Sequence, residues 1–243
     1  MTIWALNSDK ITTTMKKVLT IVMLLIFSAV LYAQQNVTQF LGIPVDGSKS
    51  AMIQKLKAKG FKSSPFDPNV LEGEFNGRNV NLHVVTNNNK VYRIAVCDAY
   101  GTDETNIKIR FNTLCQQFMN NNKYIPVASS ISEYILDDDE NISFEMTVNK
   151  KRYEAAFLQM PTGNEYITFS DELKSYLQKL YTEEQLSNPT EEQQKDIDMA
   201  ALTFLKAKCS YKSVWFLINE FSGKYFIFIY YDNELNRANG QDL

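Results

Sequence analysis

Histidine and cysteine are scarce in this chain of 243 residues, which has one histidine and three cysteines. A single histidine excludes every mechanism that needs two, and it makes a zinc site with several histidine ligands impossible. Nine glycines and six prolines are too few for a collagen-like or mucin-like chain. The sequence also lacks the Walker A, G-x-G-x-x-G, G-x-S-x-G, H-E-x-x-H and C-x-x-C motifs, so the common signatures of nucleotide, hydrolase, metalloprotease and redox sites are missing.

The balance of charge and apolar content is that of a globular protein. Lys and Arg number 25 against 28 Asp and Glu, a net charge of −3, which argues against the basic face of a nucleic-acid-binding protein. Apolar residues make up 44% of the chain and aromatic residues 12%, and this content excludes an intrinsically disordered chain.

One apolar run near the N-terminus predicts an export signal. Lys16 and Lys17 form a positively charged start, an apolar stretch from Val18 to Val30 follows, and Ala33 is the small residue expected before a cleavage site. A membrane anchor is the alternative, but the run from Val18 to Ala33 has 16 residues, fewer than the roughly 20 that span a bilayer. No cysteine directly follows the run, so the sequence offers no site for lipoprotein acylation.

We therefore expect residues 15–33 to be a signal peptide that is cleaved near Ala33, and residues 1–14 to precede the true start of translation. The mature chain would begin at Gln34, as a soluble periplasmic or secreted protein with no membrane span. Removal of three lysines and one aspartate leaves 22 Lys and Arg against 27 Asp and Glu. The mature protein is thus more acidic, at −5, than the full chain.

Helical and alternating patterns in residues 34–122 predict a helix followed by a three-stranded meander. Ser48 is a suitable N-cap for a helix that ends at Gly60. Asn76-Gly77 lies between two alternating runs, and this dipeptide is the strongest short-range signal for a hairpin with a two-residue loop.

The third strand of the meander and the helix after it are predicted in the same way. A three-residue loop, 88–90, places Val84 opposite Ile94, whereas a shift of one residue would bring an arginine opposite that valine. We expect Thr102 to cap a helix over 103–121, with one apolar stripe that covers the meander. The stripe comprises Ile107, Phe111, Leu114, Cys115 and Phe118.

Residues 123–243 predict a hairpin, two helices and a final hairpin. Apolar residues alternate on either side of a turn at Asn149-Lys150, which favours two strands over 142–157. Ser170 is a candidate cap for the first helix, and Thr190 begins the capping-box pattern of the second.

The last hairpin, with its turn at Ser222-Gly223, is the most apolar part of the mature chain. Both of its faces are apolar, so we expect it to be central in its sheet, with helices on one side and a further layer or a partner on the other. We expect the aromatic residues of this hairpin to pack in the core, in preference to stacking on a sugar or forming a partner surface. Tyr225 and Tyr231 are expected to be the most exposed of them. One face has Trp215, Leu217, Phe226, Phe228 and Tyr230, and the other has Val214, Phe216, Ile218, Ile227 and Ile229.

The meander brings together the few side chains that could act in nucleophilic catalysis. In the expected register His83 and Cys97 are diagonal neighbours on the polar face, with Glu72 nearby, so a cysteine–histidine pair with an orienting carboxylate is conceivable. An ordinary solvated sheet face is favoured, because a cysteine in mid-strand lacks the activation that a helix N-terminus gives. A Cys97–Cys209 disulfide is allowed but not implied, and Cys115 is expected to be a buried thiol.

An acidic run at 137–140 partly matches a calcium-binding loop. The first three ligand positions of an EF-hand are present, but Ile142 replaces the required glycine and Val148 the terminal glutamate. We therefore expect a solvated acidic loop there, and we expect no metal or cofactor.

Four segments of the mature chain carry a resemblance: 40–61, which begins Phe-Leu-Gly-Ile-Pro-Val; 75–77, Phe-Asn-Gly; 84–91; and 230–243, which begins Tyr-Tyr-Asp-Asn-Glu. They resemble a group of uncharacterised exported proteins of gut-type Gram-negative bacteria, which implies export and no particular activity. The order of helix and meander is also similar to that of the exported beta-lactamase-inhibitor-protein-like and PepSY-like modules, and this similarity implies binding of a partner rather than catalysis.

The sequence thus predicts an α+β fold, in which about four helices pack on antiparallel sheets built from hairpins and a meander. One domain and two lobes that meet near residue 123 both fit the pattern. The expected function is that of a periplasmic or secreted binding or accessory protein, whose partner is a protein or envelope component. The alternative is an envelope hydrolase that acts on a glycan or a peptide.

Export can be tested directly. When the full chain is expressed in a Gram-negative host, we expect the protein recovered from the periplasm or the medium to begin at Gln34, as read by N-terminal sequencing. Exported protein that still carries residues 1–33 would contradict the predicted cleavage.

Overall fold

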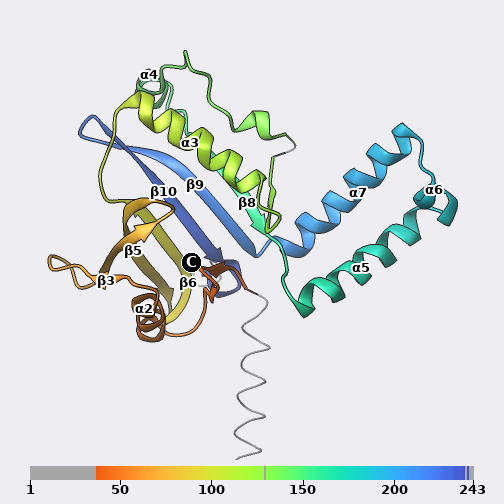
Figure 1. Cartoon of the computed structure of the whole chain (residues 1–243), viewed down its shortest axis with the longest axis horizontal. Helices are drawn as coiled ribbons and strands as arrows, with labels where there is room; N and C mark the ends of the chain where they lie inside the picture. Colours follow the sequence, from red (N-terminus) through yellow and green to blue (C-terminus); the bar gives the residue numbers. More distant parts are fainter. Residues whose placement is uncertain (1–36, 129, 239, 241–243) are drawn as a thin grey trace, which may run out of the picture. The chain divides into compact units, whose positions relative to one another are not determined.

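The computed structural model describes residues 37–128, 130–238 and 240 (Figure 1). The predicted signal peptide and the residues before it lie outside this part of the chain. From Val37 onward the protein forms one compact α+β unit, as expected for the fold class. None of the helices in the described residues is long and apolar enough to cross a membrane.

An eight-stranded antiparallel sheet takes strands from both parts of the mature chain. Its order is β3-β4-β5-β6-β10-β9-β8-β7, so the meander joins the C-terminal hairpin at the β6–β10 pair, and the hairpin is central as predicted. The strands are β3 (Lys62–Ser63), β4 (Val70–Phe75), β5 (Arg78–Asn87), β6 (Lys90–Asp98), β7 (Tyr124–Pro126), β8 (Glu154–Gln159), β9 (Lys212–Phe221) and β10 (Lys224–Asn233). A separate pair is formed by β1 (Gln39–Phe40) and β2 (Ile43–Pro44).

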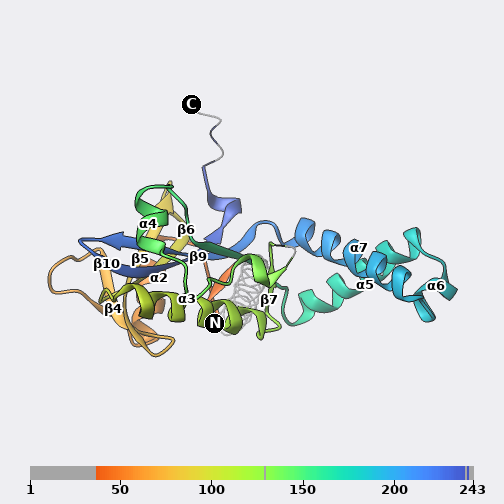
Figure 2. The ribbon, with the colours of Figure 1, turned by 90° about the horizontal axis from the view of Figure 1, so that it is seen from above.

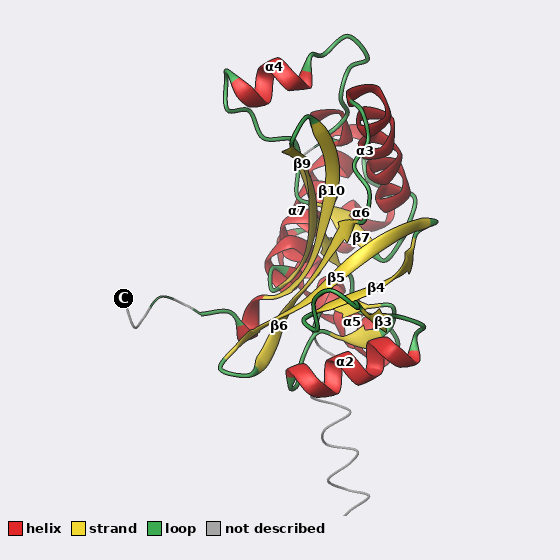
Figure 3. Cartoon of the chain, turned by 90° about the vertical axis from the view of Figure 1, so that its left-hand side faces the viewer, coloured by secondary structure: helices red, strands yellow, loops and turns green. Residues whose placement is uncertain are grey.

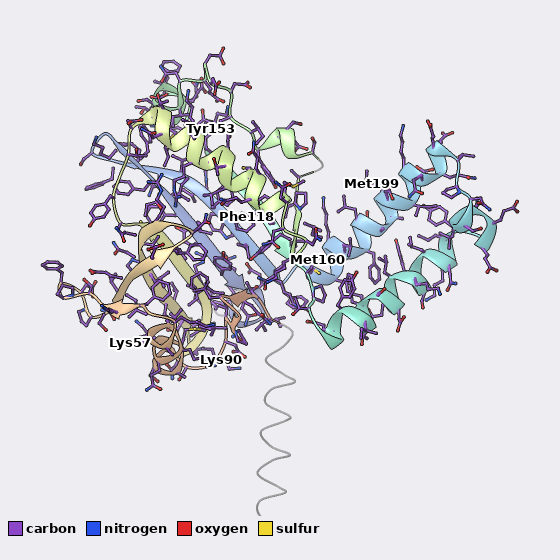
Figure 4. The ribbon with its side chains drawn as sticks, viewed as in Figure 1. Lys57, Lys90, Phe118, Tyr153, Met160 and Met199 are labelled. Atoms are coloured by element: carbon purple, nitrogen blue, oxygen red, sulfur yellow. The ribbon has the colours of Figure 1, made fainter. Side chains whose placement is uncertain are left out.

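Six α-helices lie in the described residues, two more than the sequence patterns predict. They are α2 (Lys49–Ala58), α3 (Glu104–Met119), α4 (Ile142–Thr147), α5 (Asn164–Leu180), α6 (Glu183–Ser187) and α7 (Glu191–Cys209). α2 and α3 pack on one face of the sheet (Figure 3). The predicted apolar stripe of α3 is buried there, and the Phe111 ring contacts Phe216 of β9 with centroids 5.1 Å apart. Phe118 lies at the same interface (Figure 4).

The pairs of the meander agree with the predicted register, but one turn differs. Val84 pairs with Ile94 as expected. The turn contains two asparagines, 88–89, both with positive φ, rather than the three residues 88–90. A β-bulge next to Val85 takes up the extra residue, so that the register beyond the bulge is the predicted one.

Two helix starts differ from the predicted caps. The N-cap of α3 is Asp103, which accepts a hydrogen bond from the Asn106 backbone N–H at 2.8 Å, and not Thr102. The N-cap of α5 is Gly163, so Ser170 lies inside the helix. Tertiary contacts explain why the helix starts earlier, because Phe169 in its second turn is buried in a cluster with the C-terminal end of α7.

Other local signals are confirmed. Ser48 caps α2, Asn76-Gly77 forms the two-residue turn, and Ser222-Gly223 connects the last two strands. Thr190 caps α7 in a capping box as predicted. A second capping box, which starts at Thr182 and begins the short α6, is an addition to the predicted elements.

The predicted hairpin over 142–157 is wrong, because its first half is α4. Asn141 accepts a hydrogen bond from the Phe144 backbone N–H at 2.9 Å, and Glu104 of α3 accepts one from Ile142 at 2.8 Å. These side chains satisfy N–H groups at the start of the helix. Ile142 is buried whereas Phe144 is exposed, so the alternation does not reflect a common buried face. β8 pairs with β9 and β7 instead.

The prediction that Tyr225 and Tyr231 are the exposed aromatic residues of the last hairpin is also wrong. Both are buried on the face that α2 and α3 cover, and the Tyr231 ring lies 4.9 Å from that of Phe40. Side chains alternate between the two faces of a strand, and β10 is paired so that both tyrosines lie on the covered face.

A buried ion pair connects α3 to the boundary between β6 and β10. Arg110 donates to Asp98 through Nε at 2.9 Å and Nη2 at 2.5 Å, and the two side chains are 8% and 7% exposed. Asp98 Oδ2 also accepts a hydrogen bond from the Ile227 backbone N–H at 3.0 Å. One carboxylate therefore satisfies donors from the helix and from β10.

We expect Asp98→Asn to lower the free energy of unfolding by about 3–5 kcal/mol, because it leaves the buried guanidinium of Arg110 without a counter-ion. Asp98→Leu combined with Arg110→Met should lose less, since neither charge then remains buried. Urea denaturation followed by circular dichroism measures both effects. If Asp98→Asn were as stable as the exposed control Glu154→Gln, the stabilising role of the buried carboxylate would be contradicted.

Candidate binding face of the sheet

The face of the sheet opposite α2 and α3 carries aromatic side chains at its centre. Every second residue of β9 and β10 belongs to this face, and there the apolar side chains are half-buried instead of buried. We call this surface the open face. Its apolar centre comprises Trp215, Leu217, Phe226, Phe228 and Tyr230.

The strand register places the predicted site residues at the border of the open face. Cys97 pairs with Phe228 across the β6–β10 boundary, and His83 lies two strands away from Tyr230 in the same row. Glu72 lies in the row of Cys97, on β4. His83 and Cys97 are therefore diagonal neighbours, and Glu72 lies on the same face.

Two stacked rings form the middle of the open face. Trp215 and Tyr230 are cross-strand partners, and their ring centroids are 4.3 Å apart with 30° between the planes. Phe228, whose centroid is 6.4 Å from that of Tyr230, continues the cluster along β10. Such ring pairs contribute about 0.5–1.5 kcal/mol beyond area burial. One face of each stacked ring is therefore occupied by the other ring.

An ion pair closes one end of this aromatic cluster. Arg93 of β6 donates to Asp232 of β10 through Nε and Nη2, both at 2.6 Å, and these hydrogen bonds raise the pKa of Arg93. Trp215 Nε1 donates to the same carboxylate at 2.9 Å. Arg93 Cζ lies 4.6 Å from the centre of the Tyr230 ring, a cation–π distance. The contacts fix Arg93, Trp215 and Tyr230 in one arrangement before any ligand binds.

The position of Cys97 makes it a poor nucleophile. Burial raises the pKa of its thiol to about 12, and Sγ donates a hydrogen bond to the carbonyl of Asp98 at 3.3 Å. Only the thiolate attacks an electrophile, and a thiol with this pKa is almost entirely protonated at neutral pH. All three cysteines are free, and Cys115 is the buried thiol that the sequence predicts.

The acidic run is held by neighbouring lysines. Lys108 donates to the carbonyls of Asp138 at 2.5 Å and Glu140 at 3.0 Å. The Glu140 carboxylate pairs with Lys151 and accepts a hydrogen bond from Tyr153 at 2.6 Å. In the part of the chain that the structure describes, no three His, Cys, Asp or Glu side chains are placed to hold a metal ion.

Sequence reasoning does not single out Arg93 and Asp232. The available signal is that each of the two residues is charged and has apolar neighbours in a strand, and other charged residues of β6 and β10 share part of this signal. Their partnership depends on the pairing of residues 139 positions apart, and no local pattern specifies that pairing. Comparisons with models of known protein families, with curated proteins and with solved structures find no match to this chain. What the open face can do therefore follows from its own chemistry.

The raised pKa of Cys97 has a measurable consequence. At pH 8 we expect its alkylation by iodoacetamide in the folded protein to be about a thousandfold slower than that of a free thiol, because the pKa rises from 9.0 to about 12. The rate should increase with pH and should not change in His83→Ala. Mass spectrometry of the Cys97 peptide measures it. Rapid alkylation at pH 8 that is lost in His83→Ala would favour the cysteine–histidine pair.

Proposed function

We propose that the protein is an exported binding module that holds a protein partner on the open face of its sheet. The cluster of Trp215, Tyr230 and Arg93 carries the proposal. Tryptophan, tyrosine and arginine are the residues that most often dominate the binding energy of protein interfaces. Here they are half-buried together at the centre of a sheet face that α2 and α3 leave uncovered.

Polar residues surround the cluster as they surround the centre of a typical interface. Asn81 and His83 of β5 border it on one side, and Glu154 of β8 on the other. Interfaces combine a largely apolar centre with a polar, accessible rim. The fixed geometry of Arg93 and Trp215 also favours binding, because side chains that are already ordered lose little entropy when a partner docks.

A protein partner is favoured over a glycan by the arrangement of the rings. Sugars stack on the open faces of aromatic rings, whereas Trp215 and Tyr230 use one face each for their mutual contact. Arg93 lies over Tyr230 as well, at a distance of 4.6 Å from the ring centre. The cluster therefore offers little free ring surface on Tyr230, together with a fixed guanidinium, and this combination suits the mixed surface of a protein.

The carboxylates at the centre and on the two sides of the open face do not combine into a hydrolase pair. Its central carboxylate, Asp232, is held by Arg93 and by the indole of Trp215. The carboxylates of Glu72 and Glu154 lie on β4 and β8, five strand spacings of roughly 4.8 Å apart. Glycosidase carboxylates lie within about 10 Å of each other.

Export belongs to the same proposal and is supported by the signal-peptide pattern at 15–33. The mature chain would then meet its partner in the periplasm or outside the cell.

The test compares variants of the mature chain, 34–243, as bait in an envelope extract. A partner captured by the wild type should be lost with Phe228→Lys, which places a charge in the apolar centre. It should be retained with Ile109→Lys, because Ile109 lies on α3 and is 59% exposed. With the purified partner we expect Phe228→Lys to weaken binding by roughly 30-fold or more.

Circular dichroism checks that both variants fold. Equal binding of the partner to Phe228→Lys and to the wild type would contradict the proposal. So would selective binding to a glycan array that Phe228→Lys abolishes, because the occupant would then be a sugar.

A further inference from the structure

A second surface, independent of the open face, lies on α2, which packs on the other face of the sheet (Figure 3). Residues 47–66 contain five lysines and no carboxylate, although Asp and Glu outnumber Lys and Arg in the whole chain. One of these lysines, Lys62, is the cross-strand partner of Glu72 and so belongs to the side of the open face. The other four lie on α2 and at its C-cap, and Lys90 adjoins them because its backbone bridges to that of Ser48, the N-cap (Figure 4). We call this group the basic surface: Lys49, Lys55, Lys57, Lys59 and Lys90.

No ion pair within the described residues neutralises the basic surface. None of its five lysines is paired with a carboxylate in that part of the chain. α2 contacts β5 and β6, and the one carboxylate of these strands, Asp98, is bound to Arg110. Asp46 and Asp67, which flank residues 47–66, accept hydrogen bonds from backbone N–H groups of the residues that follow them. The lysines therefore create a positive potential over α2 in a protein whose net charge is negative.

An exposed phenylalanine lies beside α2. Phe66 belongs to the loop of the β3–β4 hairpin, and 94% of its side chain is exposed. The Ser64 backbone N–H donates to the Val70 carbonyl at 2.9 Å, which closes the loop, and two prolines restrict its backbone. Lys49 donates to the amide oxygen of Asn69 at 3.3 Å and so links the loop to the first turn of α2. An ordered loop thus holds an apolar ring in water next to the basic surface.

We propose that the basic surface and Phe66 dock the protein on an anionic phospholipid bilayer. A cluster of lysines on an amphipathic helix is attracted to anionic headgroups. The ring of Phe66 has no polar group, so it can enter the boundary of the acyl chains without the loss of a hydrogen bond. Because α2 and the open face lie on opposite faces of the sheet, the docked protein still presents its open face to a partner.

The composition of the basic surface favours a bilayer over a nucleic acid or an acidic protein. All of its cations are lysines, and residues 47–66 contain no arginine, the residue whose planar guanidinium suits nucleic-acid and interface recognition. Flexible ammonium groups need no fixed arrangement of negative charges, which matches the headgroups of a fluid membrane. Residues that dominate protein interfaces lie in packed clusters, whereas Phe66 is almost fully exposed.

Two variants of the lysines separate the basic surface from the general charge of the protein. The test variant neutralises three exposed lysines at the C-terminal end of α2: Lys55→Gln, Lys57→Gln and Lys59→Gln. Its matched control removes the same charge from α5 and α7, which extend away from the sheet (Figures 1 and 2). The control replaces three lysines that are also exposed and form no ion pair with a described residue: Lys174→Gln, Lys179→Gln and Lys195→Gln.

A second pair of variants tests the aromatic ring. Phe66→Ala removes it from the loop beside α2. Phe144→Ala is the control, because Phe144 is 51% exposed and lies on α4, at the other end of the sheet from α2 (Figures 1 and 3). Circular dichroism checks that all four variants fold.

The probe is a vesicle of phosphatidylcholine with about 30% phosphatidylglycerol, and a vesicle of phosphatidylcholine alone is the neutral reference. The mature chain, 34–243, is used so that the apolar run near the N-terminus does not itself bind lipid. Vesicle flotation should give at least tenfold tighter binding to the anionic vesicles, and this binding should weaken as salt rises from about 0.1 M to about 0.5 M. The lysine variant should bind at least tenfold more weakly and Phe66→Ala about tenfold more weakly, whereas both controls should bind like the wild type.

Equal binding of the wild type to neutral and anionic vesicles would overturn the proposal, and so would equal binding of the lysine variant and its control. Unchanged binding of Phe66→Ala would contradict insertion of the ring. A polyglutamate peptide and a single-stranded oligonucleotide provide the remaining outcomes. If the wild type bound either of these and not the anionic vesicles, the basic surface would serve an acidic protein or a nucleic acid, and the proposed occupant would be wrong.

Discussion

The pairing of β6 with β10 is the constraint on which both faces of the sheet depend. It joins two parts of the chain that are far apart in sequence, and an ion pair lies on each side of it. On the covered face Asp98 binds Arg110 of α3 and the backbone of β10. On the open face Asp232 binds Arg93 and the indole of Trp215. The same strand pairing therefore positions a core helix and orders the aromatic cluster, so the core and the open face share one structural origin.

Much of the fold could be predicted from short-range chemistry. Asn76-Gly77 requires a tight turn with positive φ, and Thr190 forms a capping box, so both elements are where the sequence places them. The predictions are wrong where contacts between residues far apart in the sequence determine the local structure. Residues 142–147 alternate like a strand, yet Glu104 of α3 accepts a hydrogen bond from the N–H of Ile142 and a helix forms. Tyr231 is buried because Phe40, almost 200 residues earlier, packs against it.

The candidate site could be predicted only in part, for the same reason. Alternation along β4, β5 and β6 puts Glu72, His83 and Cys97 on one face, as the strand pairing shows. It does not report how deeply a thiol is buried, and that burial suppresses the chemistry that the cysteine–histidine spacing suggests. The residues that dominate the face come from strands brought together by tertiary pairing. The aromatic cluster thus depends on the topology of the sheet, and no local motif indicates it.

The two outermost strands have a consequence for how the protein behaves at high concentration. β3 has two residues, and β7 has three, of which the last is Pro126. Short strands and proline prevent a sheet edge from acting as a template for another chain. The sheet is therefore poorly suited to growth by addition of a foreign strand, and self-association into fibrils is disfavoured. An aromatic surface can then remain accessible on a protein whose edges resist aggregation.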